Sequence, residues 1–546
     1  MKNIIKRSSV VAMTLILLVS SSCSQDFIDV PAQGTPTLTN YYDSDLKLDN
    51  AANGLYGLVW FNMNKAGYYG ITDVISGNMY AAPYNDFGKF TDLSFTSTAS
   101  YISDSWRSCY GAIANSNAFI NGLPTGVGPE VSKEALNNAL GEAHFIRAFS
   151  YFFLVRLWGN VPIIENTADY SANFVTPSNP VADVYKFIEN DLKFAAANLR
   201  IKVRGSNYAA NAHVSSGSAK AFLAKVYLYE KKYDLAKAMA LEVINSGEFK
   251  LLGGDELPTK SFADLFLQMN NNNEESIFAW QWTGTATYFD GNFSNTTFAP
   301  ENRLVETTYS AQIAPSQDLI NNVFEAGDRR RRETFMLSGD YYPNLTYAKD
   351  LSVDAPYILG YTFDTTSATL PDGKTANPTL NGVQNSGAGL KKYVIGKENL
   401  PITGKFNKPF NGESSMNTYQ MRYAELLLIH AEAAIGSQTG STTDALALKS
   451  FNAVRKRAGL SAKASITFDD VFKERRAELA CEGDYYFDLG RLPFAKAKAI
   501  LEAQNRGDKD NPKHITITAT NLLLPYPADD LIKNPKLTEV APYTFK

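Results

Sequence analysis

The sequence predicts a mainly α-helical protein, in which a scaffold of repeated helix pairs carries a loop-rich region with short strands. Three observations lead to this fold class. Apolar residues recur at helical spacing in several long segments, which predicts helices with buried faces. Small Ala positions alternate with large Tyr and Leu in segments that follow one another in pairs. Residues 250–415 are instead rich in Asn, Gly, Thr and Pro, a composition typical of loops.

The clearest predicted helix covers residues 133–158. Ile146, Phe149, Phe153 and Leu157 recur at a spacing of three to four, and apolar residues also occupy much of the other faces. Such a helix is buried on most sides. The sequence Gly-Asn-Val-Pro follows at residues 159–162 and predicts its end. Further helices are expected at residues 41–61 and 104–122.

Two segments predict helix pairs of the tetratricopeptide type. In the first, residues 215–229 and 233–246 are separated by a short polar turn, and Ala residues face larger Tyr and Leu. In the second, residues 419–434 are followed by residues 443–458. We expect the repeat pairs mainly within 133–247 and 417–491, where stacked units would bury a continuous core.

Residues 41–546 are expected to form one domain, with its ligand-binding loops at about 62–103 and 250–415. A short alternating run at residues 276–282 predicts a strand inside the second loop region. Trp280 and Trp282 share one face of this strand, so both can be buried. Long loops on a rigid frame are where binding residues usually lie.

The N-terminus predicts an exported lipoprotein. Residues 1–22 have a basic start, a short apolar stretch at 10–19 and small residues immediately before Cys23. The apolar stretch is too short to cross a bilayer as a helix. We expect cleavage before Cys23, acylation of its side chain, and an extended tether over residues 23–40.

The other two cysteines, Cys109 and Cys481, lie in helical patterns and are expected to be free and buried. The formal net charge is −4, which gives no sign of nucleic-acid binding. The one basic run, residues 329–332, is interpreted as a solvated or salt-bridged helix start because acidic residues flank it.

A catalytic or metal site is not predicted. The four histidines have no metal-ligand spacing with each other or with cysteine, and no nucleotide-binding or nucleophile motif occurs. Acidic residues do cluster with arginines near the C-terminus. Paired carboxylates can cleave glycosides, but Glu474 and Glu478 are one helical turn apart beside Arg475 and Arg476, which favours structural ion pairs. We therefore expect no cofactor.

Aromatic residues make up 12% of the chain, and Tyr and Trp offer flat apolar faces to sugar rings. Candidate glycan-binding residues are those that combine aromatic and short polar side chains in loops; they are Asn78, Tyr80, Tyr84, Asn85, Asp86 and Phe87 in the first loop and Trp282, Tyr288 and Phe289 in the second. Burial beneath a loop is the alternative for each aromatic residue. Trp106 and Trp158 are expected in the core.

The segments that carry a family resemblance are Cys23 with residues 26–31, residues 142–164, 219–244, 422–433 and 474–483, residues 488–491, and residues 524–527 with 534–535. Together they span nearly the whole chain and resemble the SusD/RagB family. The resemblance implies a SusD-like fold with four tetratricopeptide-like helix pairs on one side. The irregular remainder, on the other side, would carry the ligand site.

The resemblance also implies a function. Such a protein is not an enzyme; it is a lipid-anchored, surface-exposed protein of the outer membrane that binds glycans and delivers them to a SusC-like TonB-dependent transporter. Peptide cargo, as in RagB-like members, is the first alternative. A surface glycosidase is the second.

Overall fold

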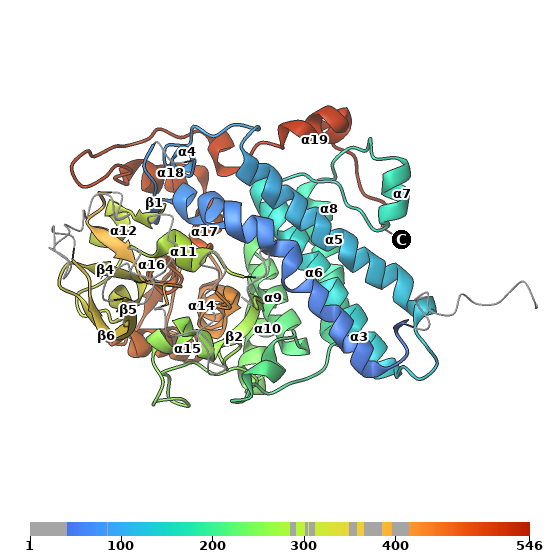
Figure 1. Ribbon diagram of the computed structural model, residues 1–546, viewed down its shortest axis with the longest axis horizontal. Coiled ribbons are helices and arrows are strands. Elements are labelled where there is room, and N and C mark those ends of the chain that lie inside the picture. Colours follow the sequence, from blue (N-terminus) through green and yellow to red (C-terminus); the bar gives the residue numbers. More distant parts are fainter. Residues whose placement is uncertain are drawn as a thin grey trace, which may run out of the picture.

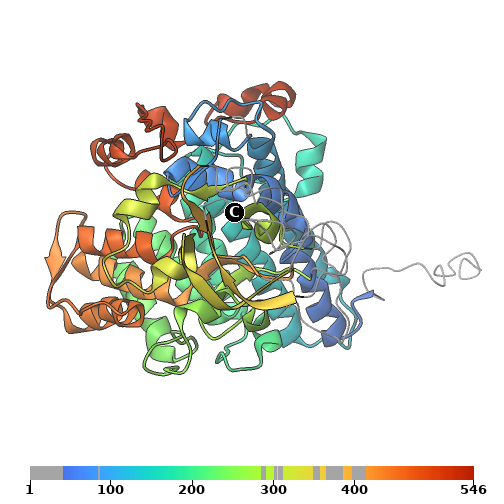
Figure 2. The same ribbon diagram turned by 60° about the vertical axis from the view of Figure 1, so that its left-hand side comes forward.

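The computed structural model describes residues 41–83, 86–283, 291–300, 304, 312–348, 357–364, 385–395 and 414–545. Figures 1 and 2 show a stack of helices from the first half of the chain on one side, and a region of short strands and loops on the other. No helix within these ranges is both long and apolar enough to cross a membrane.

The helices and strands have the following bounds. The helices are α3 (Asp45–Ala52), α4 (Gly88–Thr91), α5 (Ser100–Gly126), α6 (Lys133–Trp158), α7 (Thr167–Ala172), α8 (Val181–Asn198), α9 (Ser216–Tyr229), α10 (Tyr233–Ser246), α11 (Ser294–Phe298), α12 (Gln317–Asn322), α13 (Arg330–Thr334), α14 (Tyr423–Ile435), α15 (Ala445–Ala458), α16 (Phe468–Glu478), α17 (Tyr485–Gly490), α18 (Phe494–Ala503) and α19 (Ala528–Lys533). The strands are β1 (Met79–Tyr80), β2 (Ser276–Trp280), β3 (Ala314–Pro315), β4 (Phe335–Leu337), β5 (Tyr341–Ala348), β6 (Tyr357–Thr362), β7 (Ala388–Leu390), β8 (Thr418–Arg422), β9 (Ser441–Thr442) and β10 (Ile466–Thr467).

The mainly helical fold class is confirmed. Helices α5, α6, α8, α9, α10, α14 and α15 each pack against the next in this order, and α16 packs against α14 (Figure 1). The predicted pair α9 and α10 has nearly the predicted bounds, and so does α15. This continuous packing of neighbours is the architecture of a helical-repeat scaffold.

Helix α6 forms the centre of the stack because its sequence is apolar on nearly every side. Ser132 caps its start by accepting a hydrogen bond from the Ala135 N–H at 3.1 Å. Gly159 ends it with φ of +75°, a conformation that costs glycine little. The ring of Phe149 packs edge-on against Phe278 at 4.8 Å between centroids and against Trp60 at 5.4 Å. Helix, strand and N-terminal segment thus share one aromatic core.

The strands pair two by two, all antiparallel: β1 with β3, β2 with β8, β4 with β7, β5 with β6, and β9 with β10. The expectation of a helix from residue 419 is therefore wrong at its start. Residues 418–422 pair with β2, and the helix begins at Tyr423. Trp280 is fully buried and stacks on Trp60 with centroids 5.2 Å apart.

The expected helix over residues 41–61 is also corrected. It is broken after Ala52 into short 3-10 turns, η2 (Asn53–Leu55) and η3 (Leu58–Trp60). Gly54 and Gly57 weaken a helix here, since glycine is a poor helix former. Gly57 also lies so close to the Gln281 carbonyl that a β-carbon would stand 2.8 Å from its oxygen. The turn therefore lets the chain approach the end of β2.

Two of the cysteines and two of the tryptophans are buried as predicted, whereas the basic run agrees with its prediction only in part. Cys109 and Cys481 are free and buried, as predicted. Trp106 and Trp158 are buried at 5% and 3% exposure. In the basic run, Arg330 is fully buried and forms a salt bridge with Asp328 at 2.7 Å. The interpretation as a salt-bridged helix start is therefore confirmed for Arg330, and the interpretation as a solvated residue is wrong for it.

Candidate ligand-binding surface

The first predicted binding loop leads from β1 into α4 and is fixed at its base. Residues Met79 and Tyr80 pair with Pro315 and Ala314. The Thr91 hydroxyl donates to the Ala81 carbonyl at 3.0 Å, which closes the loop across its neck. The loop therefore starts and ends at fixed points of the fold.

The structure places the described candidate residues of this loop as follows. Asn78 is fully buried, and its side-chain oxygen accepts a hydrogen bond from Arg476 Nε at 3.0 Å. Tyr80 is 5% exposed and Phe87 4%, and the Phe87 ring stacks on Tyr101 with centroids 4.6 Å apart. The carboxylate of Asp86 is open to solvent at 77% exposure. Tyr84 and Asn85 lie outside the described residues.

In the second loop, Trp282 is 5% exposed. Its indole N–H donates to the Thr418 hydroxyl at 3.1 Å, and its ring lies edge-on to Phe61 at 6.4 Å. Tyr288 and Phe289 lie outside the described residues. Tyr80, Phe87 and Trp282 therefore pack inside the protein, which is the burial that the sequence left open as the alternative for each aromatic residue. Their part in ligand contact stays a prediction.

Two residues that the sequence did not suggest fix the backbone at the base of the first loop by hydrogen bonds. Arg506 is 2% exposed and donates to the carbonyls of Val74, Ile75 and Thr91 at 3.3, 2.9 and 3.3 Å. Burial lowers the pKa of its guanidinium to about 10. Gln504 donates to the Ser76 carbonyl at 3.0 Å. Both come from a segment more than four hundred residues later in the chain, and no motif marks them.

The acidic cluster near the C-terminus is a buried ion network. Glu478 is fully buried and accepts from Arg422 at 2.9 Å, from Arg330 at 3.1 Å and from Arg457. These guanidinium groups hold the pKa of the Glu478 carboxyl far below its usual range, in spite of its burial. A carboxyl that stays ionised in this way cannot serve as a general acid.

The other members of the cluster are paired in the same manner. Glu482 accepts from Arg422 Nε and Lys392 Nζ, both at 2.7 Å, and Glu474 lies 2.7 Å from Arg330. Their residue exposures lie between 4% and 6%. The predicted interpretation as structural ion pairs is supported, because each of these carboxylates is paired with a buried cation.

Some carboxyl groups have the opposite shift, and it is largest at Asp73 and Asp484. Burial raises the pKa of Asp73 to about 7 and that of Asp484 to about 6. Raised values occur at catalytic acids, but Asp73 is fully buried and Asp484 is 8% exposed and lies 2.8 Å from Lys225 Nζ. No group of three or more His, Cys, Asp or Glu side chains that could hold a metal ion occurs within the described ranges.

Family models and known proteins are similar to this chain along its length. Residues 252–543 match the model described as SusD family, and residues 26–228 match one described as "Starch-binding associating with outer membrane". A SusD-like protein of Bacteroides ovatus is 30% identical over 99% of each chain. SusD-like protein P2 of Formosa agariphila is 24% identical and covers 96% of this chain and 98% of its own.

Solved structures are similar to this chain over most of its length. A crystal structure with a xylogluco-oligosaccharide is 28% identical, covers 91% of this chain and 99% of its own, and has a TM-score of 0.76. A SusD-like protein of Bacteroides fragilis shares the fold at 19% identity, with a TM-score of 0.67 over 91% of this chain and 97% of its own. The chain therefore belongs to the SusD family.

Proposed function

We propose that this protein binds glycans at the cell surface without cleaving them and delivers them to a SusC-like TonB-dependent transporter. The observation that carries the proposal is the full-length similarity to a protein whose crystal structure was determined with a xylogluco-oligosaccharide, at 28% identity. The helical stack supplies a rigid frame, and the loop region beside it is where a ligand-binding surface of this kind belongs.

The N-terminus and the family model support a proposal for the cellular location. The family model over residues 26–228 is described as associating with the outer membrane. Cys23 follows a short apolar segment and small residues, which is the pattern of a lipoprotein signal. We propose that acyl chains on Cys23 anchor the protein in the outer membrane, with residues 23–40 as a tether and the folded domain exposed at the surface.

A binding role without catalysis is supported by the chemistry of the acidic side chains. A glycosidase needs two carboxyl groups on opposite sides of the scissile bond, one of them protonated. The clustered carboxylates Glu474, Glu478 and Glu482 are instead neutralised by buried cations. The pairs join α16 to β8 and α13, so their evident role is to hold these elements together.

The first test is affinity electrophoresis of the soluble domain through gels that contain one polysaccharide each, with serum albumin as the reference. The panel contains xyloglucan, starch, laminarin and mucin glycans. We expect at least one gel to retard the protein, with little change between low and physiological salt because a neutral sugar contributes no ion pair. Reducing-sugar release should stay at background.

The alternatives give different results. Retention by no polysaccharide together with binding of peptides would favour peptide cargo. Release of reducing sugar by pure protein, lost in Glu478→Gln, would favour a surface glycosidase. For transport, the transporter should co-purify with the protein from outer membranes, and its absence would contradict the delivery role.

A further inference from the structure

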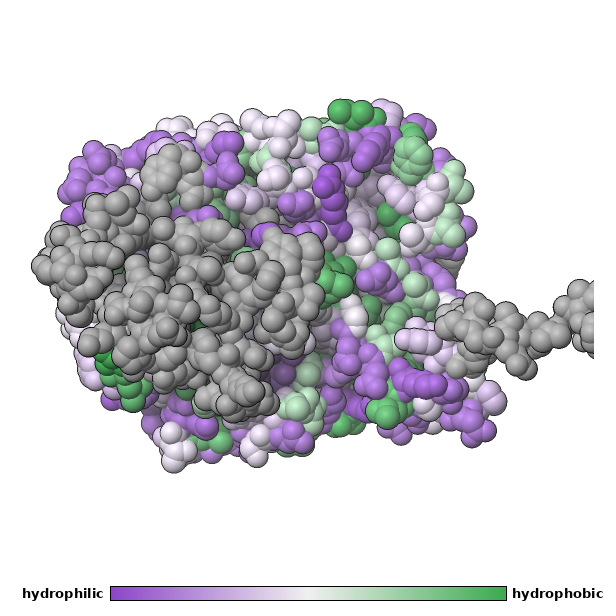
Figure 3. Space-filling view, viewed as in Figure 1, coloured by the Kyte–Doolittle hydropathy of each residue, from purple (hydrophilic) through white to green (hydrophobic). Residues whose placement is uncertain are grey.

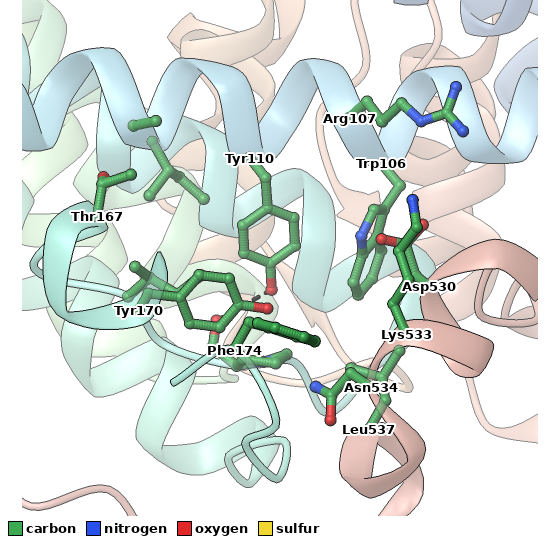
Figure 4. Close-up of a pocket in the computed structure, with 14 residues that line it drawn as sticks. Trp106, Arg107, Tyr110, Thr167, Tyr170, Phe174, Asp530, Lys533, Asn534 and Leu537 are labelled. Carbon is green, nitrogen blue, oxygen red and sulfur yellow. Dashed lines mark hydrogen bonds between the residues drawn. The ribbon is translucent and has the colours of Figure 1, made fainter. Parts of the chain in front are cut away.

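A pocket lies between α5, α7 and α19, and none of the candidate glycan-binding residues lines it. Its volume is about 490 Å3, which falls in the range of small-ligand pockets, roughly 300–1,000 Å3. Figure 4 shows side chains from these three helices pointing toward one another around it. In Figure 1 these helices lie at the opposite end of the molecule from β4, β5 and β6.

The floor of the pocket consists of two aromatic rings on α5. Trp106 and Tyr110 are neighbours, with ring centroids 4.9 Å apart. The Trp106 ring is held edge-on by Trp158 at 5.1 Å and by Tyr526 at 5.9 Å. The Tyr110 hydroxyl donates to the Pro162 carbonyl at 3.0 Å. The rings therefore form a preformed apolar surface that a ligand need not order.

Two further aromatic residues form a more open wall. Tyr170, on α7, and Phe174, just after it, line the pocket. Phe174 is 48% exposed, so part of its ring is open to solvent. In Figure 4 the rings of Tyr170 and Phe174 lie across the pocket from Asp530 and Lys533. A flat ligand can thus contact aromatic faces on more than one side.

The charged groups of the pocket come from α19 and α5. Asp530 and Lys533 line it from α19 and Arg107 from α5, so a ligand meets one carboxylate acceptor and two cationic donors. Burial raises the pKa of the Asp530 carboxyl, while nearby Lys533, Arg107 and the Trp106 indole N–H partly offset this. A ligand hydroxyl that donated to this carboxylate would relieve part of the cost of its burial.

We propose that this pocket binds a single sugar ring, such as the end of a glycan chain, with its C–H face against Tyr110, Tyr170 and Phe174 and its hydroxyls toward Asp530 and Lys533. The inference rests on the proposed glycan-binding function and adds a second subsite to it. Such a pocket would select chain ends, whereas the loop region would hold the length of a chain.

An apolar side chain of a partner protein would fit this pocket less well. It could cover the aromatic rings but would make no hydrogen bond to Asp530 or Lys533, so the loss of water from these groups would go uncompensated. A sugar offers both an apolar face and several hydroxyl donors. The pocket's combination of four aromatic rings with one carboxylate, one amine and one guanidinium matches that chemistry.

The test uses ligand-observed NMR titrations of the soluble domain with the methyl β-glycosides of glucose, galactose and xylose, and with indole as an apolar probe. Two variants remove pocket contacts, Phe174→Ala and Asp530→Asn. Ile532→Ala is the matched control, because Ile532 lies on the same helix, is 80% exposed and does not line the pocket. All three positions are at least partly open to solvent, so the variants should fold.

We expect at least one glycoside to bind the parent and Ile532→Ala alike, with a dissociation constant in the millimolar range. Phe174→Ala should weaken binding about threefold to tenfold through loss of a ring contact. Asp530→Asn should weaken it about tenfold through loss of a charged acceptor. Affinity of the parent should fall as the pH is lowered through the Asp530 pKa, and the Asn variant should lose this dependence.

Three results would overturn the inference: glycosides that bind both variants as they bind the parent, indole binding without any glycoside binding, or no binding at all. The polysaccharide gels distinguish these from failure of the proposed function. If a polysaccharide retards the parent and both variants equally while no glycoside binds, the protein is a glycan binder and the pocket is not its subsite. If no polysaccharide retards the parent either, both proposals fail.

Discussion

The strongest prediction concerns the single substitution Glu478→Gln. Glu478 faces Arg330, Arg422 and Arg457, and the side chains of all four residues are at most 1% exposed. Gln keeps the shape of Glu but removes the negative charge, so three buried guanidinium groups lose a shared counter-ion. Removal of one partner from a buried ion pair costs about 3–5 kcal/mol.

This cost converts into a modest shift of the melting temperature, because the chain is long. At about 2.1 cal/mol/K per residue, the unfolding entropy of a protein of this length is roughly 1.1 kcal/mol/K. The substitution should therefore lower Tm by about 3–5 °C in scanning calorimetry. Since the folded-state pKa of Glu478 lies below that of an unfolded Glu, its contribution to stability is present above pH about 4.3 and is lost as pH falls further.

Glu242→Gln is the matched control. Glu242 pairs with Lys220 at 2.5 Å, but the side chains are 54% and 30% exposed. Such a surface pair contributes about 0–1 kcal/mol, so Tm should move by at most about 1 °C. If Glu478→Gln melts within 1 °C of the parent, or no further from it than the control, the carboxylate is not the counter-ion that the geometry implies.

Three other substitutions test separate parts of the proposal. Cys23→Ala should remove the protein from the outer-membrane fraction in cell fractionation, and normal levels there would place the anchor elsewhere. Trp282→Ala should lower Tm by about 3–5 °C, since loss of a buried Trp costs about 3–5 kcal/mol; a variant that melts like the parent but binds no glycan would return Trp282 to the binding surface. Asp73 has a folded-state pKa of about 7 against about 3.9 when unfolded, so its contribution to the free energy of unfolding is full below pH 4 and decreases by on the order of 4 kcal/mol as pH rises to 7. Asp73→Asn should therefore reduce the decrease in the free energy of unfolding, measured in urea, between pH 4.5 and 7.5. The same pH dependence in the variant and the parent would refute the raised pKa of Asp73.

The helices that the sequence predicted well are those set by local signals. Helix α6 has the predicted bounds because a cap at Ser132, a long apolar pattern and Gly159 all lie within or next to it. The helix predicted for residues 419–422 is wrong because the pairing of these residues with β2 outweighs their local helical pattern. Helix α8 was not predicted, although it packs against α6 and α9.

The candidate binding residues were less predictable, because composition does not say which face of a loop points inward. Asn78 and Phe87 have the residue types of a sugar site, but Arg476 and Tyr101 occupy them as packing partners. The pocket on α5 was missed for a related reason. Trp106 was expected in the core, and it is buried, but it also lines a cavity that is completed by α7 and by residues over four hundred positions later.

The C-terminal segment connects the two candidate surfaces. Arg506 holds the base of the first binding loop through three backbone carbonyls. Further on, the Pro525 carbonyl accepts from the Trp158 indole at 3.0 Å, and Tyr526 packs against the Trp106 ring. Asp530 then completes the pocket. One continuous stretch therefore contacts the base of the loop and also lines the pocket, so disruption of its backbone should affect both surfaces. Changes at Phe174 or Asp530 should affect the pocket alone. This difference separates a local subsite from a general loss of structure.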